Sequence, residues 1–280
     1  MSKYISDLAV AEFDRDVKKA YAEDANLSRL IKIRSGVVGT TVRFQKAAQG
    51  MANKKVSQAD VTPMNIDYSY VTATMQDWNA PDYTDIFDAP KVNFDEKSEL
   101  VQLSAAAVRR REDQIIIDAL EAGATTLTVA TNIGDSNLMN TGKFRDAKRQ
   151  LDYYNVPGQD RAFLMSSEAL YNMLGEDTVD NFDTNAVKAL VSGELHHWLG
   201  FEVITIGYMA EGGLPIDDSS IRSAFAFHKS SMGMGIGLNM RTEINYIAQK
   251  TSWLVNTVFS AGAVAIDAYG MVTISHEEAV

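Results

Sequence analysis

The glycine run from Gly233 to Gly237 is the first segment whose residue types and spacing suggest chemistry. It reads Gly-Met-Gly-Ile-Gly, and glycine-rich loops can bind phosphate because their backbone N–H groups approach the anion closely. A dinucleotide-binding loop needs its third glycine three residues after the second, with a helix following. Here the third glycine comes one residue early and no helical pattern follows. We therefore expect a turn or a bulged strand at this position.

The four histidines show no spacing typical of a metal site or a catalytic base. His196 and His197 are adjacent, so on a helix their rings would diverge, whereas zinc-binding histidines on a helix stand four residues apart. His228 and His276 are isolated in the sequence, and the chain has no cysteine and no Gly-x-Ser-x-Gly nucleophile motif. We predict no catalytic residue, no metal ligand and no cofactor.

The composition is that of an ordinary soluble protein with an acidic surface. Of the 280 residues, 46% are hydrophobic and 22% charged, and the formal net charge is −11. Proteins that read nucleic-acid sequence normally carry a basic surface, so the charge argues against that class. No stretch approaches the roughly 20 apolar residues of a membrane-spanning helix, and the N-terminus lacks the pattern of a signal peptide. We expect a protein that is made and kept in a cytoplasm, without a membrane partner.

Basic and acidic side chains are segregated in neighbouring segments. Residues 42–55 contain four basic side chains and no acidic one, whereas residues 60–90 contain six aspartates and no Lys or Arg. Alternating runs of β-branched and aromatic residues in the same region predict a β-hairpin with its tip at about 47–58. Because a two-stranded ribbon is marginally stable alone, we expect the hairpin to lie on something outside itself.

These charged segments supply most of the residues that we predict at contacts between subunits. A segment of one sign can meet a complementary surface on another copy, and the alternative is that both segments are simply solvated faces. The predicted contact residues are Arg43, Lys46, Lys54 and Lys55 in the basic segment, and Asp77, Asp82, Asp85 and Asp88 in the acidic one.

One long helix is predicted at 94–122. Asn93 is a suitable N-cap, Glu96 stands at the third helical position, and Gly123 provides a stop. At 1.5 Å per residue this helix is roughly 40 Å long. Glu112 interrupts its apolar stripe, which we interpret as a core helix with one paired carboxylate.

Three consecutive arginines, Arg109, Arg110 and Arg111, lie within this predicted helix. Successive side chains on a helix point about 100° apart, so the three guanidinium groups do not form one patch. This geometry disfavours a nucleic-acid site and favours salt bridges between subunits. We add the three arginines to the predicted contact residues.

The rest of the chain mixes helices and strands without regular alternation or an internal repeat. Helices are predicted at 144–154, 167–174 and 186–198, and strands at 125–129, 161–165, 201–206, 224–227, 242–248, 252–259 and 271–274. This order indicates the α+β class.

A central stretch resembles the capsid proteins of tailed bacteriophages. It reads LDYYNVPGQDRAFLMSSEALYNML at 151–174, and in that family a helix likewise ends at Val-Pro before a strand led by Arg and a short helix. The run from Gly200 to Val203 is similar to the start of a later strand of the family. The hairpin and long capped helix are similar to its extended loop and spine helix. In the order of its elements, the resemblance covers essentially the whole chain.

The resemblance implies the Hong Kong 97 capsid fold in four parts. Residues 1–36 would form an N-terminal arm and residues 37–80 the extended β-hairpin loop. Residues 81–155 would form a peripheral domain with the spine helix at 94–122, which also receives C-terminal strands. Residues 156–280 would form mainly the axial domain.

The resemblance also implies a structural protein of the virion and not an enzyme. Copies of the chain would form pentamers and hexamers that close into an icosahedral shell, assembled in the host bacterial cytoplasm. The shell would enclose double-stranded DNA without sequence-specific binding, for which an acidic wall is suitable. Implied partners are a separate scaffolding protein and a portal, with a decoration protein as a further candidate.

Some members of the family join subunits through an isopeptide bond between a lysine and an asparagine, assisted by a glutamate. Lys54 and Lys55 lie near the predicted tip of the loop, but no asparagine or glutamate here matches the motif, so this chemistry is not carried over. Three alternatives remain open: a nanocompartment shell of the encapsulin type, another phage structural protein such as a tail component, and a soluble α+β enzyme.

Overall fold

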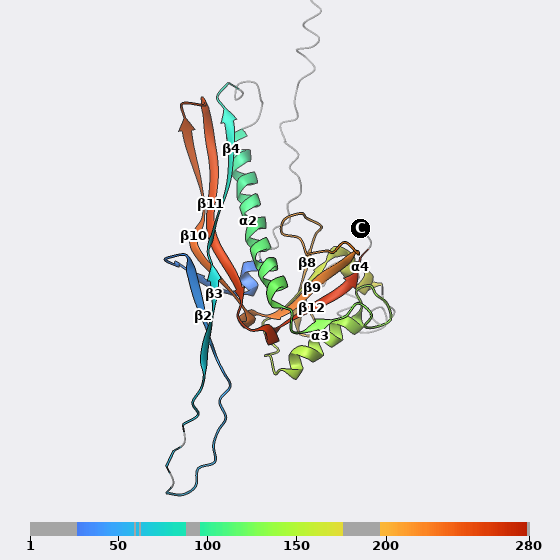
Figure 1. Cartoon of the computed structure of the whole chain (residues 1–280). Helices are drawn as coiled ribbons and strands as arrows, with labels where there is room; N and C mark the ends of the chain where they lie inside the picture. Colours follow the sequence, from blue (N-terminus) through green and yellow to red (C-terminus); the bar gives the residue numbers. More distant parts are fainter. Residues whose placement is uncertain (1–26, 59, 62, 88–95, 176–196, 279–280) are drawn as a thin grey trace, which may run out of the picture.

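Two bodies and a projecting hairpin make up the described part of the chain (Figure 1). The computed structural model describes residues 27–58, 60–61, 63–87, 96–175 and 197–278. One body is elongated and contains the long helix, and the second is a smaller unit of sheet and helices at its side. In the described residues, no helix is both long enough and apolar enough to cross a bilayer.

The elongated body consists of helix α2 (Glu96–Gly123) packed along a four-stranded sheet. The sheet has the order β1-β10-β11-β4, with the bounds β1 Lys32–Ser35, β10 Met232–Ile247, β11 Ser252–Ala265 and β4 Gln76–Asp85. Ile116, Leu120 and Phe259 are buried in the same hydrophobic core between helix and sheet. The predicted long helix and its end at Gly123 are confirmed, whereas the predicted N-cap at Asn93 lies outside the described residues.

Glu112 on α2 lies where the 3₁₀ helix η1 (Leu27–Leu30) packs on α2. The side chain of Ser28 forms a hydrogen bond with Glu112, and the carboxylate of Asp113 accepts the backbone N–H of Leu27 at 2.8 Å. Burial, and then the charge of Asp113, raises the pKa of Glu112 above its usual value. The Glu112 carboxylate thus has a hydrogen-bond partner, Ser28 of η1, in agreement with its interpretation as a paired carboxylate.

The second body is a six-stranded sheet flanked by α3 (Thr141–Tyr153) and α4 (Ser167–Leu174). The strand order is β5-β12-β9-β6-β8-β7, with the bounds β5 Thr128–Val129, β12 Met271–Glu277, β9 Ile221–His228, β6 Arg161–Ser166, β8 Phe201–Ile206 and β7 His197–Trp198. Phe144 of α3 stacks on Phe163 of β6 with ring centroids 4.0 Å apart, and the Phe201 ring meets Phe144 edge-on at 5.3 Å. This aromatic core holds α3 on the sheet.

The predicted helix at 186–198 is wrong at its C-terminal end. Residues 186–196 lie outside the described residues, but His197–Trp198 form strand β7, which pairs with β8 through Trp198 and Phe201. The two residues between these strands, Leu199 and Gly200, have positive φ angles of 49° and 87°. Positive φ at both central positions is the signature of a tight hairpin turn. Gly200 therefore closes a hairpin and does not end a helix.

The predicted hairpin is confirmed as β2 (Thr41–Ala47) paired antiparallel with β3 (Tyr68–Thr74). It projects from the elongated body in the direction opposite to the turn between β10 and β11 (Figure 1). The backbone N–H of Ala48 donates to the carbonyl of Asp67 at 2.9 Å and ends the ladder. The connecting loop therefore spans residues 48–67, which is longer than the predicted tip at 47–58.

The glycine run lies inside strand β10, and the register between β10 and β11 shifts on both sides of Leu238. The interpretation of this run as a bulged strand is confirmed. Two further 3₁₀ turns, η2 (Lys229–Ser231) and η3 (Ala268–Gly270), precede β10 and β12.

Glycines allow the root of the hairpin to pack closely on the sheet beneath it. A Cβ atom on Gly235 would lie 2.5 Å from the Val42 side chain, and one on Gly262 would lie 2.1 Å from the carbonyl oxygen of Thr74. Real Cβ atoms do not approach other atoms so closely, so any larger residue would displace the hairpin. The glycines that suggested phosphate binding thus belong to the site at which the hairpin is fixed to the sheet.

The division into four parts stays a prediction, but strand pairing bears on two of its boundaries. The boundary at residue 80 falls within β4, which pairs with β11 along its whole length. The boundary at residue 155 separates α3 from the six-stranded sheet on which it packs. By packing, β4 belongs with the elongated body and α3 with the second body.

Candidate assembly surfaces

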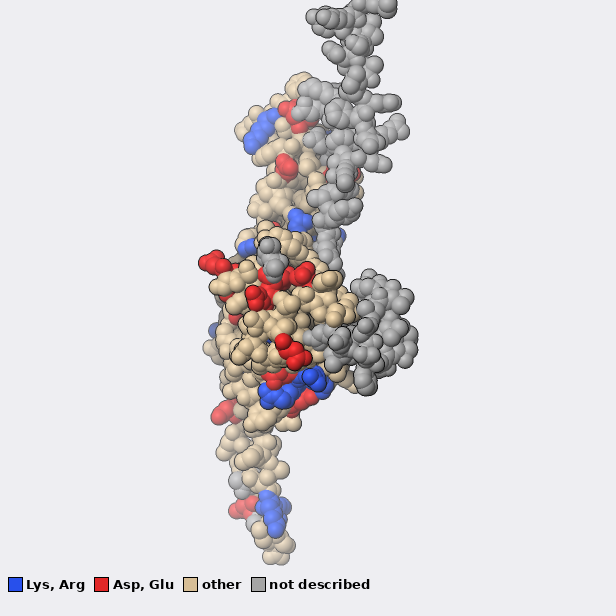
Figure 2. Space-filling model, turned by 90° about the vertical axis from the view of Figure 1, so that its right-hand side faces the viewer, with Lys and Arg blue, Asp and Glu red and all other residues tan. Residues whose placement is uncertain are grey.

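The loop at residues 48–67 exposes apolar and basic side chains together. Four of its large apolar residues are more than half exposed: Met51 82%, Val56 65%, Val61 76% and Met64 54%. Lys54 and Lys55 lie among them and are also exposed. Figure 2 shows the end of this loop as a narrow projection carrying basic and acidic atoms on a mostly uncharged surface. Apolar area on a projection of this kind is typical of a surface that another protein covers.

Two of the predicted basic residues lie in the stem of the hairpin and make contacts within their own chain. The ammonium group of Lys46 lies 2.7 Å from a carboxylate oxygen of Asp267, which joins the stem to the connection before β12. The guanidinium group of Arg43 lies over the ring of Tyr70, 4.7 Å from its centroid. Their predicted role between copies stays a prediction, and the structure adds a local one, since Lys46 braces the hairpin.

The predicted acidic residues lie on β4, away from the hairpin loop. Asp77 and Asp82 are exposed and Asp85 is half-buried, whereas Asp88 lies outside the described residues. The carboxylates of Asp82 and Asp85 accept backbone N–H groups one and two positions further along the chain. Because β4 runs up the elongated body (Figure 1), the structure does not bring the acidic and basic residues of one subunit together. A contact between the two sets would have to join different copies.

Of the three predicted arginines, Arg111 turns toward its own chain. Its guanidinium group stacks over the Trp78 ring, 3.6 Å from the centroid, and lies 3.4 Å from a carboxylate oxygen of Glu211. Arg109 is exposed and Arg110 half-buried, as expected for side chains that splay around a helix. Arg111 therefore helps to join α2 to β4, and the role of all three between copies stays a prediction.

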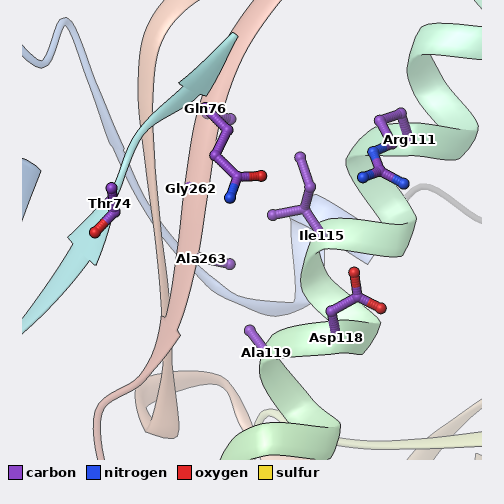
Figure 3. Close-up of a pocket in the computed structure, with 9 residues that line it drawn as sticks. Thr74, Gln76, Arg111, Ile115, Asp118, Ala119, Gly262 and Ala263 are labelled. Carbon is purple, nitrogen blue, oxygen red and sulfur yellow. The ribbon is translucent and has the colours of Figure 1, made fainter. Parts of the chain in front are cut away.

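A small cavity of about 220 Å³ lies where the hairpin root, α2 and β11 meet. In Figure 3, Ile115 of α2 points toward Gln76 of β4 and the backbone of β11 at Gly262, and Arg111 and Asp118 lie on the neighbouring turns of the helix. The Asp118 carboxylate accepts a hydrogen bond from Gln114 at 2.6 Å. The lining includes no Ser, Cys or Lys nucleophile beside a base, and the described residues hold no group of three potential metal ligands. We assign no reaction to this cavity.

Sequence reasoning missed a buried cluster of charges at the end of β12. The Glu278 carboxylate lies 2.5 Å from Nε of Arg222 and accepts the hydroxyl of Ser166 at 3.0 Å. Nε2 of His276 lies 3.5 Å from the same carboxylate. The ammonium group of Lys143 is a second buried cation and donates to two backbone carbonyls at 2.6 and 2.8 Å. We call Lys143, Arg222, His276 and Glu278 the C-terminal charge cluster.

The sequence alone could not indicate this cluster, because its members come from distant segments: α3, β9 and the end of β12. His276 is isolated along the chain but has three charged neighbours in space. Two cations and one carboxylate around a histidine disfavour a bound metal ion. The cluster is therefore structural, and it anchors the last strand in the sheet.

Acid should destabilise the chain through His276. Burial, and then the cations Lys143 and Arg222, lowers the pKa of His276 to about 4, although the Glu278 carboxylate acts in the opposite direction. The unfolded chain takes up this proton near pH 6.5, so the unfolding free energy falls as the pH drops from about 6.5 to 4, by up to about 3 kcal/mol. Chemical denaturation across this pH range should show a smaller fall in the unfolding free energy for His276→Leu than for the wild-type chain.

The exposed His197 provides a matched control for the loss of a histidine, so His197→Leu should be measured beside His276→Leu. If the unfolding free energy depends on pH equally in the wild-type chain and in His276→Leu, His276 is not the source of the acid destabilisation.

A family model described as phage capsid protein matches residues 5–278 of this chain. No curated protein sequence matches it significantly.

Solved structures of phage capsids are similar to the chain along nearly its whole length. The capsid of cyanophage P-SCSP1u superposes with a TM-score of 0.78 at 15% identity, covering 100% of this chain and 96% of that one. The head of Helicobacter pylori bacteriophage KHP40 gives 0.78 at 13% identity, with 95% of each chain covered. Mycobacterium phage Che8 gives 0.70 at 14% identity, covering 94% of this chain and 95% of that one. These likenesses confirm the predicted α+β fold of the Hong Kong 97 type.

Proposed function

This chain belongs to the phage capsid protein family, and we propose that its copies assemble as pentamers and hexamers into an icosahedral shell around double-stranded DNA. The chain is a major capsid protein, a structural component of the virion and not an enzyme. The described surface agrees with this role, because its most prominent features are a projecting hairpin and exposed apolar side chains at the end of that hairpin.

The observation that carries the proposal is the loop at residues 48–67. It stands away from its own chain on a two-stranded stem, with four large apolar side chains in water. Leaving such side chains exposed sacrifices roughly 1.5 to 3 kcal/mol each relative to burial. A neighbouring copy that covers the loop recovers part of this free energy. Pentamers and hexamers are rings, and a ring of identical copies needs a contact that joins unlike surfaces of successive copies.

The acidic charge of the chain is compatible with the proposed contents of the shell. With a net charge of −11, each copy repels a polyanion more than it attracts one. Such a wall can enclose double-stranded DNA without binding it tightly or reading its sequence. We propose that the protein reaches the virion shell by assembly in the host bacterial cytoplasm.

Further partners belong to the same proposal. A separate scaffolding protein would set the size of the shell, a portal would occupy one vertex, and a decoration protein is a further candidate. If a separate scaffolding protein sets the size of the shell, the chain expressed alone should give shells of mixed size or open sheets. Uniform closed shells from the chain alone would count against a separate scaffold.

Electron microscopy of the particles tests the function directly. We expect closed polyhedral shells in the high-molecular-weight fraction when the chain is produced with the other head proteins of its phage. Particles from infected cells should contain DNA that resists added nuclease. Shells that contain a protein cargo and no DNA would favour a nanocompartment. Small discrete oligomers under every condition would refute shell formation.

A further inference from the structure

Three tyrosines form an exposed aromatic cluster where α3 ends. The rings of Tyr153 and Tyr154 meet edge-on with centroids 5.1 Å apart, and Tyr154 lies against Tyr269 of η3 at 4.7 Å. Despite these contacts the side chains remain 75%, 40% and 46% exposed, respectively. We call these residues the tyrosine triad. Its rings hold one another in place, so little rotamer entropy is left to lose when a partner covers them.

The tyrosine triad lies at the foot of the hairpin. Asp267, two residues before Tyr269, forms the ion pair that braces Lys46 in the hairpin stem. In Figure 1, α3 runs along the lower edge of the second body, on the side toward which the hairpin projects. The hairpin and the tyrosine triad therefore lie on the same side of the molecule.

The opposite edge of the second body carries a different chemistry. The connection between β8 and β9, residues 207–220, lies there (Figure 1). Asp217 and Asp218 are exposed on this connection, and carboxylates accept hydrogen bonds from tyrosine hydroxyls. In a ring of identical copies joined by unlike surfaces, one edge of each copy meets the opposite edge of the next. The edge that bears the triad would then meet the edge that bears residues 207–220.

We propose that the tyrosine triad binds the 207–220 edge of a second copy of this chain, as the inner anchor of the contact whose outer anchor is the hairpin loop. This inference rests on the proposed function and deepens it, because it names both sides of one contact between copies. Tyrosine is enriched among the residues that contribute most to the free energy of an interface, since its ring buries apolar area while its hydroxyl remains hydrogen-bonded. Each subunit would grip its neighbour at two separated points, which fixes the angle between them.

A photo-crosslinker at the most exposed ring gives the first test. With p-benzoylphenylalanine at Tyr153 and the full chain assembled into shells, irradiation should produce covalent dimers. Mass spectrometry should identify the linked peptide within or beside residues 207–220. Crosslinks to any other segment, or none in closed shells, would overturn the proposal. The same substitution at Tyr171 of α4, which is 71% exposed, controls for reaction at any surface tyrosine, and it should not link to that peptide.

Removing the rings gives the second test. The double variant Tyr153→Ser and Tyr269→Ser should keep the circular dichroism spectrum of the wild-type subunit, because both side chains lie at the surface. Its concentration for half-maximal shell formation should rise by about tenfold or more, whereas Tyr171→Ser should match the wild type. A double variant that assembles like the wild type refutes this inference alone. Failure of the wild-type chain to form shells when it is produced with the other head proteins of its phage would instead refute the proposed function.

Discussion

A subunit in which residues 49–66 are replaced by Asn-Gly should fold but fail to form shells. The backbone N–H of Ala48 donates to the carbonyl of Asp67 at 2.9 Å, so these two residues form a hydrogen-bonded pair that a two-residue turn can close without changing the register of the hairpin. The shorter connection should raise the unfolding free energy by up to about 2 kcal/mol, because less loop entropy is lost on folding. The variant also lacks the apolar side chains that a neighbour would bury, each of which contributes about 1.5 to 3 kcal/mol. Sedimentation should therefore show subunits or small oligomers in place of shells.

A second variant separates the surface of the loop from its length. This variant keeps the length of the loop but removes four of its exposed apolar side chains, through Met51→Ser, Val56→Ser, Val61→Ser and Met64→Ser. We expect this variant to assemble at least about tenfold less efficiently than the wild type. If the shortened subunit still forms closed shells in normal yield, the loop is not the assembly device.

The hairpin and the long helix could be predicted because their signals are local. Alternating β-branched residues mark β2 and β3, and a helix longer than 25 residues that stops at Gly123 is visible in the periodicity and the stop signal. The error at His197 is also local, since Leu199 and Gly200 have the conformation of a hairpin turn, which the sequence Leu-Gly does not announce. Local patterns were thus sufficient to predict these elements. They were not sufficient to predict the turn at Leu199 and Gly200, because the preference of Leu-Gly for a hairpin turn is weak.

Features that depend on distant residues could not be predicted. Gly262 is required only because the Thr74 backbone crosses above it, and no pattern within either strand indicates that crossing. The acidic and basic segments are neighbours in sequence, yet β4 joins the elongated body while the hairpin leaves it. Proximity in the chain was therefore a poor guide to proximity in space for Asp77 and Lys54. The resemblance to capsid proteins supplied the overall arrangement that the local signals lacked.

Replacement of the buried carboxylate of the C-terminal charge cluster should have the largest effect on stability. In Glu278→Gln, the guanidinium group of Arg222 would lose its anionic partner at 2.5 Å while remaining buried. Removal of one partner from a buried ion pair costs about 3 to 5 kcal/mol, because the remaining charge has left water without compensation. The second buried cation, Lys143, makes this loss of stability greater. Denaturation by urea should show the loss as a lower midpoint.

The neighbouring glutamate provides a matched control for this prediction. Glu277 is exposed and accepts only a long hydrogen bond, 3.3 Å, from Asn137, so Glu277→Gln should change the unfolding free energy by less than about 0.5 kcal/mol. The double variant Arg222→Met and Glu278→Leu should recover much of the stability lost in Glu278→Gln, because a well-packed apolar pair carries no desolvated charge. Equal stabilities for Glu278→Gln and Glu277→Gln would show that Arg222 finds another partner. In that case the last strand would be held by its ladder with β9 and β5 and not by the charge cluster.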